Sequence, residues 1–165
     1  MMASAVYERL KARFGERVIS FDAEARQPWI LIEPSAIAEV CAFVRDDPEL
    51  RCESLSNESG VDYKAQGWIE IVYHLYSYTH RHYVILKVRT PRDAAEVPTV
   101  EGVWKAANWL EREIYDLLGV TFTGHSDLRR LLMPEDWIGY PLRKDFVEPE
   151  EYHGIPTSRE SLLKA

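Results

Sequence analysis

Apolar residues recur one helical turn apart in three segments of the chain. The segments 4–14 and 34–46 each carry an apolar stripe, which predicts two short amphipathic helices. The segment 100–118 carries a longer stripe that is close to a heptad. Thr99 is a suitable N-cap for it and Gly119 is a natural left-handed stop, so the pattern predicts a third helix between these two residues.

Alternation of apolar and polar residues predicts the strands. The segment 17–33 has the pattern of a strand, a polar turn and a second strand. A weak alternation over 49–56 predicts another strand, and the sequence Asn-Glu-Ser-Gly at 57–60 is typical of a turn. The clearest pair is 68–78 and 83–89, in which every second residue is apolar and a short polar turn joins the two. This pattern predicts a hairpin with one buried face.

The order of these elements is helix, two strands, helix, three strands, helix and an irregular tail. It predicts an α+β fold, a two-layer domain with a mostly antiparallel mixed sheet packed by helices. In the tail, prolines recur so closely that no long element fits, which predicts an extended C-terminal segment. We therefore expect an α+β core domain over 1–119 and an extended docking segment over 120–165.

Composition and charge narrow the class of protein. The 165 residues carry a net charge of −7 at pH 7, which argues against a nucleic-acid partner because such a protein needs a basic face. No apolar run reaches the roughly 20 residues that cross a bilayer, and the charged start does not fit a signal peptide, so we expect a cytosolic chain. Cys41 and Cys52 are too few for a disulfide framework, a zinc knuckle or an iron–sulfur cluster.

The histidines suggest a metal site as one alternative. His80 and His82 lie at the end of the predicted hairpin, where His74 could approach them, although histidines at such a turn are usually solvated. A stand-alone metal-dependent hydrolase that uses these residues or His125 is the runner-up hypothesis, which metal analysis would test. His125 and Asp127 could also form a base and its orienting partner, but Asp127 is equally suited to starting a turn. Nucleophile elbows and phosphate loops are absent from the sequence.

The third helix and the segment 124–146 after it carry balanced charges among aromatic residues. On the helix, Arg112 and Asp116 have the spacing of an i, i+4 pair, and a solvated charged face is the usual explanation. The segment after the helix supplies arginines that could pair with the helix carboxylates and rings that could cover them. Because protein interfaces are enriched in arginine and aromatic residues, we interpret this segment as one that lies on a protein surface.

The same region resembles a known family. The sequence EREIYDLLGVTFTGHSDLRRLLMPEDWIGYPLRKDF, residues 111–146, is similar to the signature of the 30-kDa subunit of respiratory complex I, the C subunit of NADH-quinone oxidoreductase. A weaker likeness extends upstream to about residue 50. Ser126 stands where the family usually has proline, and Leu118 stands where an aromatic residue is common. Neither departure removes a charged residue of the signature.

This resemblance implies a non-catalytic peripheral-arm subunit of a proton-translocating NADH:quinone oxidoreductase. The subunit would scaffold the complex and dock onto the 49-kDa-type quinone-site subunit. It would carry no cofactor or metal, while the complex would carry FMN and iron–sulfur clusters and use NADH and quinone. The expected location is the cytoplasmic face of the bacterial cell membrane, with membrane contact only through the complex. An equivalent subunit of a related membrane-bound hydrogenase or other complex-I-like dehydrogenase is the alternative.

The signature also predicts which residues contact the partner. We expect the helix residues of this group to look like ordinary surface in the free chain and to become less exposed in the complex. The predicted docking residues are Glu111, Arg112, Glu113, Asp116, His125, Asp127, Arg129, Arg130, Trp137, Pro141, Leu142, Arg143, Lys144 and Asp145.

Overall fold

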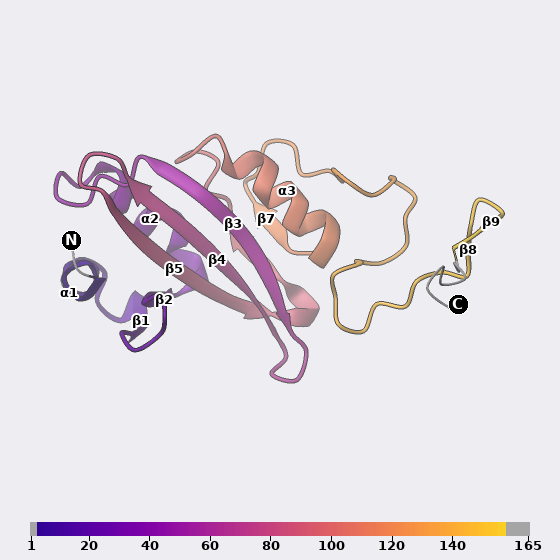
Figure 1. Ribbon diagram of the computed structural model, residues 1–165, viewed down its shortest axis with the longest axis horizontal. Helices are drawn as coiled ribbons and strands as arrows, with labels where there is room; N and C mark the ends of the chain where they lie inside the picture. Colours follow the sequence, from indigo (N-terminus) through magenta and orange to yellow (C-terminus); the bar gives the residue numbers. More distant parts are fainter. Residues whose placement is uncertain (1–2, 158–165) are drawn as a thin grey trace, which may run out of the picture.

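A computed structural model describes residues 3–157 of the chain. The helices lie near the start of the chain and next to the C-terminal segment, and the long strands lie between them (Figure 1). The elements are α1 Ala3–Phe14, β1 Val18–Asp22, β2 Trp29–Ile32, α2 Ile37–Asp46, β3 Ser54–Tyr63, β4 Trp68–Ser77, β5 His82–Pro91, β6 Glu96–Pro98, α3 Ala107–Leu118, β7 Thr121–Thr123, β8 Glu151–Tyr152 and β9 Ile155–Pro156, with single 3₁₀ turns at Gly15–Arg17, Pro34–Ala36 and Arg92–Ala94.

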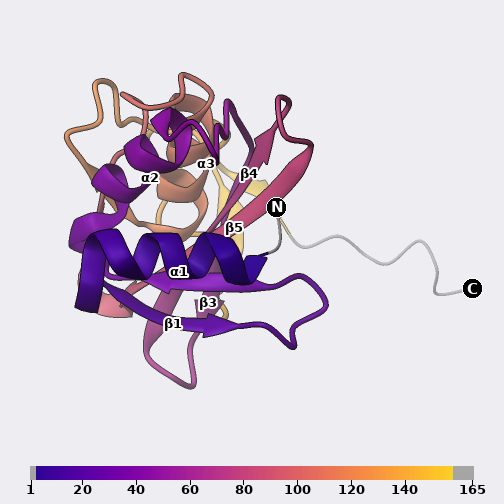
Figure 2. The same ribbon diagram turned by 90° about the vertical axis from the view of Figure 1, so that its left-hand side faces the viewer.

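Five strands form the main sheet in the order β1-β2-β5-β4-β3. The pair β2 and β5 is parallel, and the other three pairs are antiparallel. Helix α1 and the end of α2 are linked by an ion pair between Arg9 and Asp47 and lie against the sheet (Figure 2). The predicted α+β class, with a mostly antiparallel mixed sheet packed by helices, is therefore confirmed.

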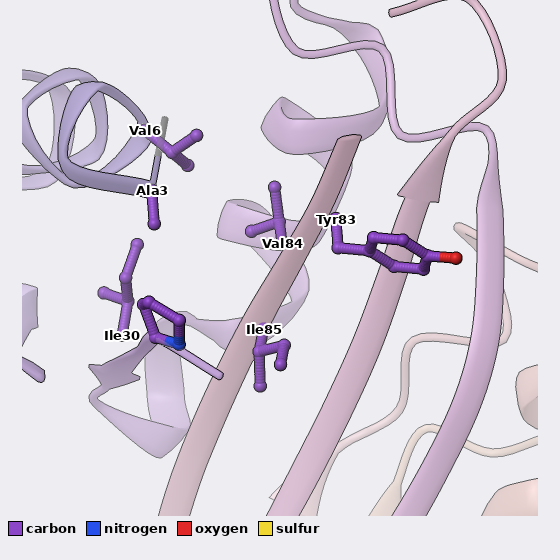
Figure 3. Close-up of a pocket in the computed structure, with 7 residues that line it drawn as sticks. Ala3, Val6, Ile30, Tyr83, Val84 and Ile85 are labelled. Atoms are coloured by element: carbon purple, nitrogen blue, oxygen red, sulfur yellow. The ribbon is translucent and has the colours of Figure 1, made fainter. Parts of the chain in front are cut away.

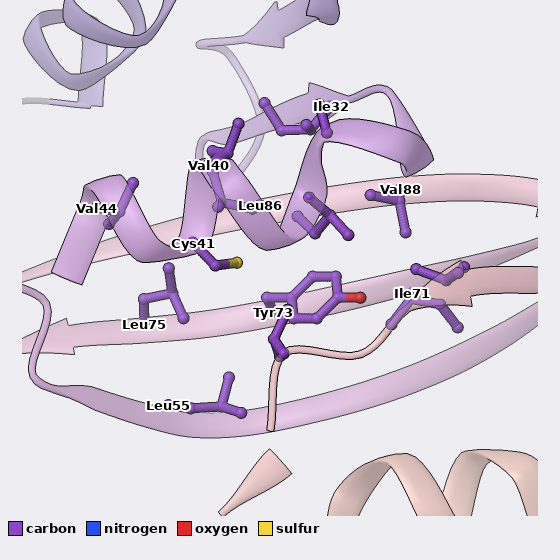
Figure 4. Close-up of a cluster of buried hydrophobic side chains, with 14 of the residues drawn as sticks. Ile32, Val40, Cys41, Val44, Leu55, Ile71, Tyr73, Leu75, Leu86 and Val88 are labelled. Carbon is purple, nitrogen blue, oxygen red and sulfur yellow. The ribbon is translucent and has the colours of Figure 1, made fainter. Parts of the chain in front are cut away.

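The core lies between the helices and one face of the sheet. Alternate residues of β4, including Ile71, Tyr73 and Leu75, point toward α2, where Val40 and Cys41 meet them (Figure 4). These side chains are buried. The predicted hairpin and its buried face are confirmed, because strict alternation places every second side chain of a strand on the same face.

The strand before the hairpin differs from its prediction. The segment 57–60 does not form a turn but lies inside β3, which pairs with β4 from Ser54 to Tyr63. The register shifts between Leu55 and Asn57, and residues 49–53 lie outside the strand, which together account for the weak alternation over 49–56. A glycine is needed at position 60 of this strand, because a Cβ there would overlap the side chain of Leu118 from α3. Packing, not turn propensity, determines the structure here.

The third helix is shorter than predicted and the core is longer. Helix α3 begins at Ala107, and the residues before it form a turn in which the backbone N–H of Trp104 donates to the Val100 carbonyl. Thr99 does not cap the helix. Gly119 is left-handed, with a φ of 71°, as predicted. The following strand β7 pairs in parallel with β6 and buries Phe122, so the core extends to residue 123 and the C-terminal segment begins after it.

Candidate docking site

Three of the charged residues of α3 are buried inside the chain, contrary to the expectation of an ordinary surface. Glu111 and Asp116 are fully buried, and Arg112 is nearly so. The C-terminal segment covers them as it runs along α3 (Figure 1). Glu113, on the same helix, is exposed. The periodicity of α3 did not predict this burial because the covering layer is a segment without periodic structure.

Asp116 binds the segment through its carboxylate. One oxygen accepts the backbone N–H groups of three consecutive residues, Leu131 at 3.0 Å, Leu132 at 2.6 Å and Met133 at 2.8 Å. The other accepts Nη1 of Arg130 at 2.7 Å. Burial acts to raise the pKa of Asp116, but these hydrogen bonds outweigh burial and hold its pKa below the usual value. The carboxylate therefore stays charged and fixes the path of the backbone.

Arginines complete this attachment by donating to backbone carbonyls. The i, i+4 spacing predicted a pair between Arg112 and Asp116, but Arg112 donates instead to the carbonyls of Arg129 and Arg130. Arg130 reaches in turn to the carbonyls of residues 137 and 139. The two guanidinium groups thus supply hydrogen bonds to carbonyl groups of an irregular segment, which has no neighbouring strand to provide them.

The end of α3 is closed by a second anchor. Arg143 donates through Nε to the carbonyl of Leu118 at 2.7 Å and lies over the ring of Tyr140. That ring packs directly on Gly119, where a Cβ would overlap it. A cation at the C-terminus of a helix is favourable because the last carbonyls carry partial negative charge.

His125 connects the segment to the start of α3 through both of its ring nitrogens. Its Nε2 donates to the carbonyl of Asn108 at 3.1 Å, and its Nδ1 accepts the N–H of Asp127 at 3.0 Å. The carboxylate of Asp127 binds Arg129 instead, so the predicted base–orienter pair does not form. Both ring nitrogens are occupied, which is the geometry of a structural histidine.

Glu111 lies beneath this histidine. One of its oxygens accepts the N–H of Val100 at 2.6 Å, and the other binds the hydroxyl of Thr99. The second oxygen is 3.8 Å from Nε2 of His125. Burial raises the pKa of Glu111 to about 7. Glu111 therefore holds the turn before α3 in place of the predicted N-cap by Thr99.

The last part of the signature binds the sheet. Asp62 of β3 accepts two hydrogen bonds from Arg92, at 2.8 and 3.1 Å, and one from the N–H of Lys144 at 2.8 Å. Nη2 of the same arginine also binds Asp145. The Arg92 guanidinium holds the pKa of both carboxyls below their usual values. Lys144 itself is exposed.

Apolar side chains of the segment and of α3 point outward, between these anchors. Ile138 is 85% exposed and Val147 84% exposed. Most of these residues are absent from the predicted docking set, although they stand near charged residues whose side chains turn inward in the structure. The outward surface, as we call this group, consists of Trp109, Leu132, Ile138, Leu142 and Val147.

The remaining predicted docking residues differ in exposure. Trp137 and Pro141 are half-buried, and the indole N–H of Trp137 has no hydrogen-bond partner among the described residues. Arg129 is largely exposed. Most of the predicted docking residues therefore lie on α3 or contact it. Some of them are buried and hold the C-terminal segment in place, and a smaller group is exposed.

The histidines that were candidates for a metal site are brought together only in part: the ring centroids of His80 and His82 lie 6.0 Å apart. Within residues 3–157, no group of three or more histidine, cysteine or acidic side chains is placed to hold a metal ion. Nε2 of His80 lies 2.9 Å from the carbonyl of Pro48, and His82 is buried beside the hairpin turn. A hollow between α1 and the strands, beside Val6 and Val84, has a volume of about 10 Å³ (Figure 3). That is room for about one water molecule.

No helix in the described part of the chain has the length and hydropathy to span a membrane. Fold and site together define a class of protein: a two-layer α+β domain whose last helix binds an extended C-terminal segment through buried carboxylate and arginine groups. Residues 30–152 match the family described as the 30-kDa subunit of respiratory-chain NADH dehydrogenase. The chain belongs to this family, and the resemblance noted in the sequence is confirmed.

Related proteins align with most of the length of this chain. It is 43% identical to the C subunit of NADH-quinone oxidoreductase from Chlorobium phaeobacteroides, over 93% of this chain and 93% of that protein. It is 45% identical to the corresponding C subunit from a Roseiflexus species, over 86% of this chain and 82% of that protein.

Two solved structures share the fold. A trypsin-resistant fragment of Nqo5 has a TM-score of 0.64 at 26% identity and covers 78% of this chain and 100% of that one. A chain of the membrane-bound sulfane sulfur reductase, an archaeal respiratory membrane complex, has a TM-score of 0.67 at 24% identity. It covers 87% of this chain and 85% of its own length, and at this identity the likeness concerns the fold alone.

Proposed function

We propose that this chain is a non-catalytic peripheral-arm subunit of a proton-translocating NADH:quinone oxidoreductase. Its role is to scaffold the complex by docking onto the 49-kDa-type quinone-site subunit. FMN, the iron–sulfur clusters, NADH and quinone are bound by other subunits in this proposal. The chain sits on the cytoplasmic face of the membrane and reaches it only through the complex. Membership of the 30-kDa subunit family supports the complex, and the outward surface supports the docking role.

The observation that carries the docking role is the reversal of polarity along the C-terminal segment. Charged side chains such as Arg130 turn inward and fix the backbone, while the apolar side chains Leu132 and Ile138 turn outward. A segment that served only the stability of this chain would bury its apolar residues against the core. Exposed apolar side chains on a rigidly held backbone are what a protein interface requires.

An aspartate substitution at Ile138 tests this proposal. Because Ile138 is 85% exposed, Ile138→Asp leaves the melting temperature of the free chain unchanged. In the complex it places a charge in a desolvated contact, so we expect at least a tenfold loss of tagged chain co-purifying with the large subunit and a parallel loss of NADH:quinone activity in membranes.

Ile19→Asp is the matched control. Ile19 is also exposed, at 54%, but it lies on β1, at the opposite edge of the sheet from β3. This variant is expected to assemble like the wild type. Normal assembly and activity of Ile138→Asp would refute docking through the outward surface.

A further inference from the structure

Strand β3 ends the main sheet and has a free outer edge in the described part of the chain. Its ten residues pair with β4 on one side only. Between Asn57 and Asp62, no backbone hydrogen bond other than those to β4 is present among residues 3–157. Edge strands of this length are a template for another strand, and proteins usually shorten or cover them.

A groove runs along this edge between β3 and α3. It has a volume of about 120 Å³, and its walls are residues 57–60 of β3, the apolar side chains Ile114 and Leu117 of α3, and Leu142 of the C-terminal segment. Leu142 also belongs to the outward surface. The groove is therefore continuous with the surface proposed to dock, and it has room for a side chain of a bound segment.

One residue that lines the groove has a buried carboxyl group without a hydrogen-bond partner among the described residues. Glu58 is 3% exposed, lines the groove, and neither of its oxygens is hydrogen-bonded within the described residues. Tyr73 lies directly opposite on β4, and its hydroxyl is likewise unpartnered among these residues. Buried polar atoms are nearly always hydrogen-bonded in native proteins, so an unpartnered carboxyl beside an open groove indicates a donor supplied from outside.

The charge around the groove selects the donor. Glu113 lies on its rim, and Glu111 is close enough to raise the pKa of Glu58 together with burial, the larger cause. Neither lysine nor arginine lines the groove within the described residues. A second copy of this acidic chain would add like charge, whereas a basic segment would offset it.

We propose that the groove between β3 and α3 binds an extended basic segment of a partner subunit, which pairs with the outer edge of β3 and places a lysine or arginine side chain against Glu58. This inference rests on the proposed function, because it assigns the mode of contact to the same assembly. Backbone pairing supplies affinity in strand addition, and the side-chain pocket supplies specificity.

Hydrogen exchange tests the backbone part. Amides of residues 57–62 that face away from β4 exchange rapidly in the free chain, and we expect them to slow by about a hundredfold in the purified complex. Amides that face β4 should change little, which gives an alternating pattern. Unchanged exchange in a complex that contains the chain would overturn strand addition while leaving the proposed function standing. Failure of the chain to co-purify with the complex would refute both.

Glu58→Gln tests the side-chain part. Removal of an unpartnered buried carboxyl raises the melting temperature of the free chain or leaves it unchanged. Glutamine cannot ionise, so it cannot form the ion pair that a bound lysine or arginine would make with Glu58, and we expect about a tenfold loss of chain in the complex. Glu8→Gln, on the exposed face of α1, is the control. Wild-type assembly of Glu58→Gln, or a homodimer of the free chain joined through β3, would overturn the proposal.

Discussion

Replacement of Asp116 by Asn is expected to release the C-terminal segment without unfolding the core. The carboxylate accepts three backbone N–H groups at one oxygen and Arg130 at the other. The asparagine amide cannot replace the carboxylate, because its NH₂ group would face either the backbone N–H groups or Arg130, all of which are hydrogen-bond donors. The other anchors of the segment are Arg112 at the carbonyls of residues 129 and 130, His125, Arg143 and Asp62. None of these groups binds the backbone of residues 131–133.

The size of the effect follows from these hydrogen bonds. A hydrogen bond to a charged group contributes about 1.5–3 kcal/mol, but a released segment regains hydrogen bonds to water. The breaking of a buried ion pair typically costs about 3–5 kcal/mol. We therefore expect the attachment of the segment to weaken by about 3 kcal/mol, which corresponds to about a hundredfold increase in the open population.

Limited trypsin digestion measures that population. Cleavage after Arg129 and Arg130 requires an open segment, so its rate at low protease concentration follows the open fraction. We expect about hundredfold faster cleavage in Asp116→Asn, and an unchanged urea midpoint for the core. Asp127→Asn is the control, because Asp127 pairs with Arg129 at the surface, where an ion pair contributes about 0–1 kcal/mol. If trypsin cleaved Asp116→Asn at the wild-type rate, the proposed attachment of the segment through Asp116 would be refuted.

Two further predictions concern α3. Because the pKa of Glu111 is raised from 4.5 to about 7, the unfolded chain releases this proton first, and the free energy of unfolding should fall as pH rises from about 4.5 to 7, by an amount on the order of 3 kcal/mol. Glu111→Gln should flatten this dependence in urea titrations, and an equal slope in both proteins would contradict it. Gly119→Ala should destabilise the chain by more than Gly154→Ala, by about 2 kcal/mol, because both residues have positive φ but only the first would also meet the ring of Tyr140. Equal melting temperatures for the two variants would show that this ring does not pack on α3.

The hairpin and the helices could be predicted because one repeating pattern dominates each of them. On one face of β4, every second residue from Ile69 to Leu75 is apolar, and the strand pairs with β5 without a register shift. The bounds of β3 could not be predicted, because its register shifts between Leu55 and Asn57 and because Gly60 stands where α3 approaches the strand. Local turn propensity at 57–60 favoured the wrong structure, and a contact with a residue far along the chain overrode it.

The candidate site shows a different limit. Sequence identified the charged residues of α3 and the segment as a connected set, since their spacing matched a family signature. It did not show that Arg112 turns to the carbonyls of the segment, because an i, i+4 carboxylate offers the opposite charge at shorter range. A pattern of side chains does not predict where the backbone groups of an irregular segment lie. Three consecutive N–H groups of that backbone are nevertheless the partners of Asp116.

The buried charges give the docking segment its rigidity. An extended segment that becomes ordered only on binding loses conformational entropy at that step, at about 1–2 kcal/mol per residue for the backbone. Here Asp116, Arg130 and Arg143 fix the backbone through hydrogen bonds within the chain itself. The outward surface is therefore presented already ordered, and most of its contact energy remains available for assembly. Under the proposed function, the inward anchors would thus serve the partner indirectly, through the shape of a surface that contains none of them.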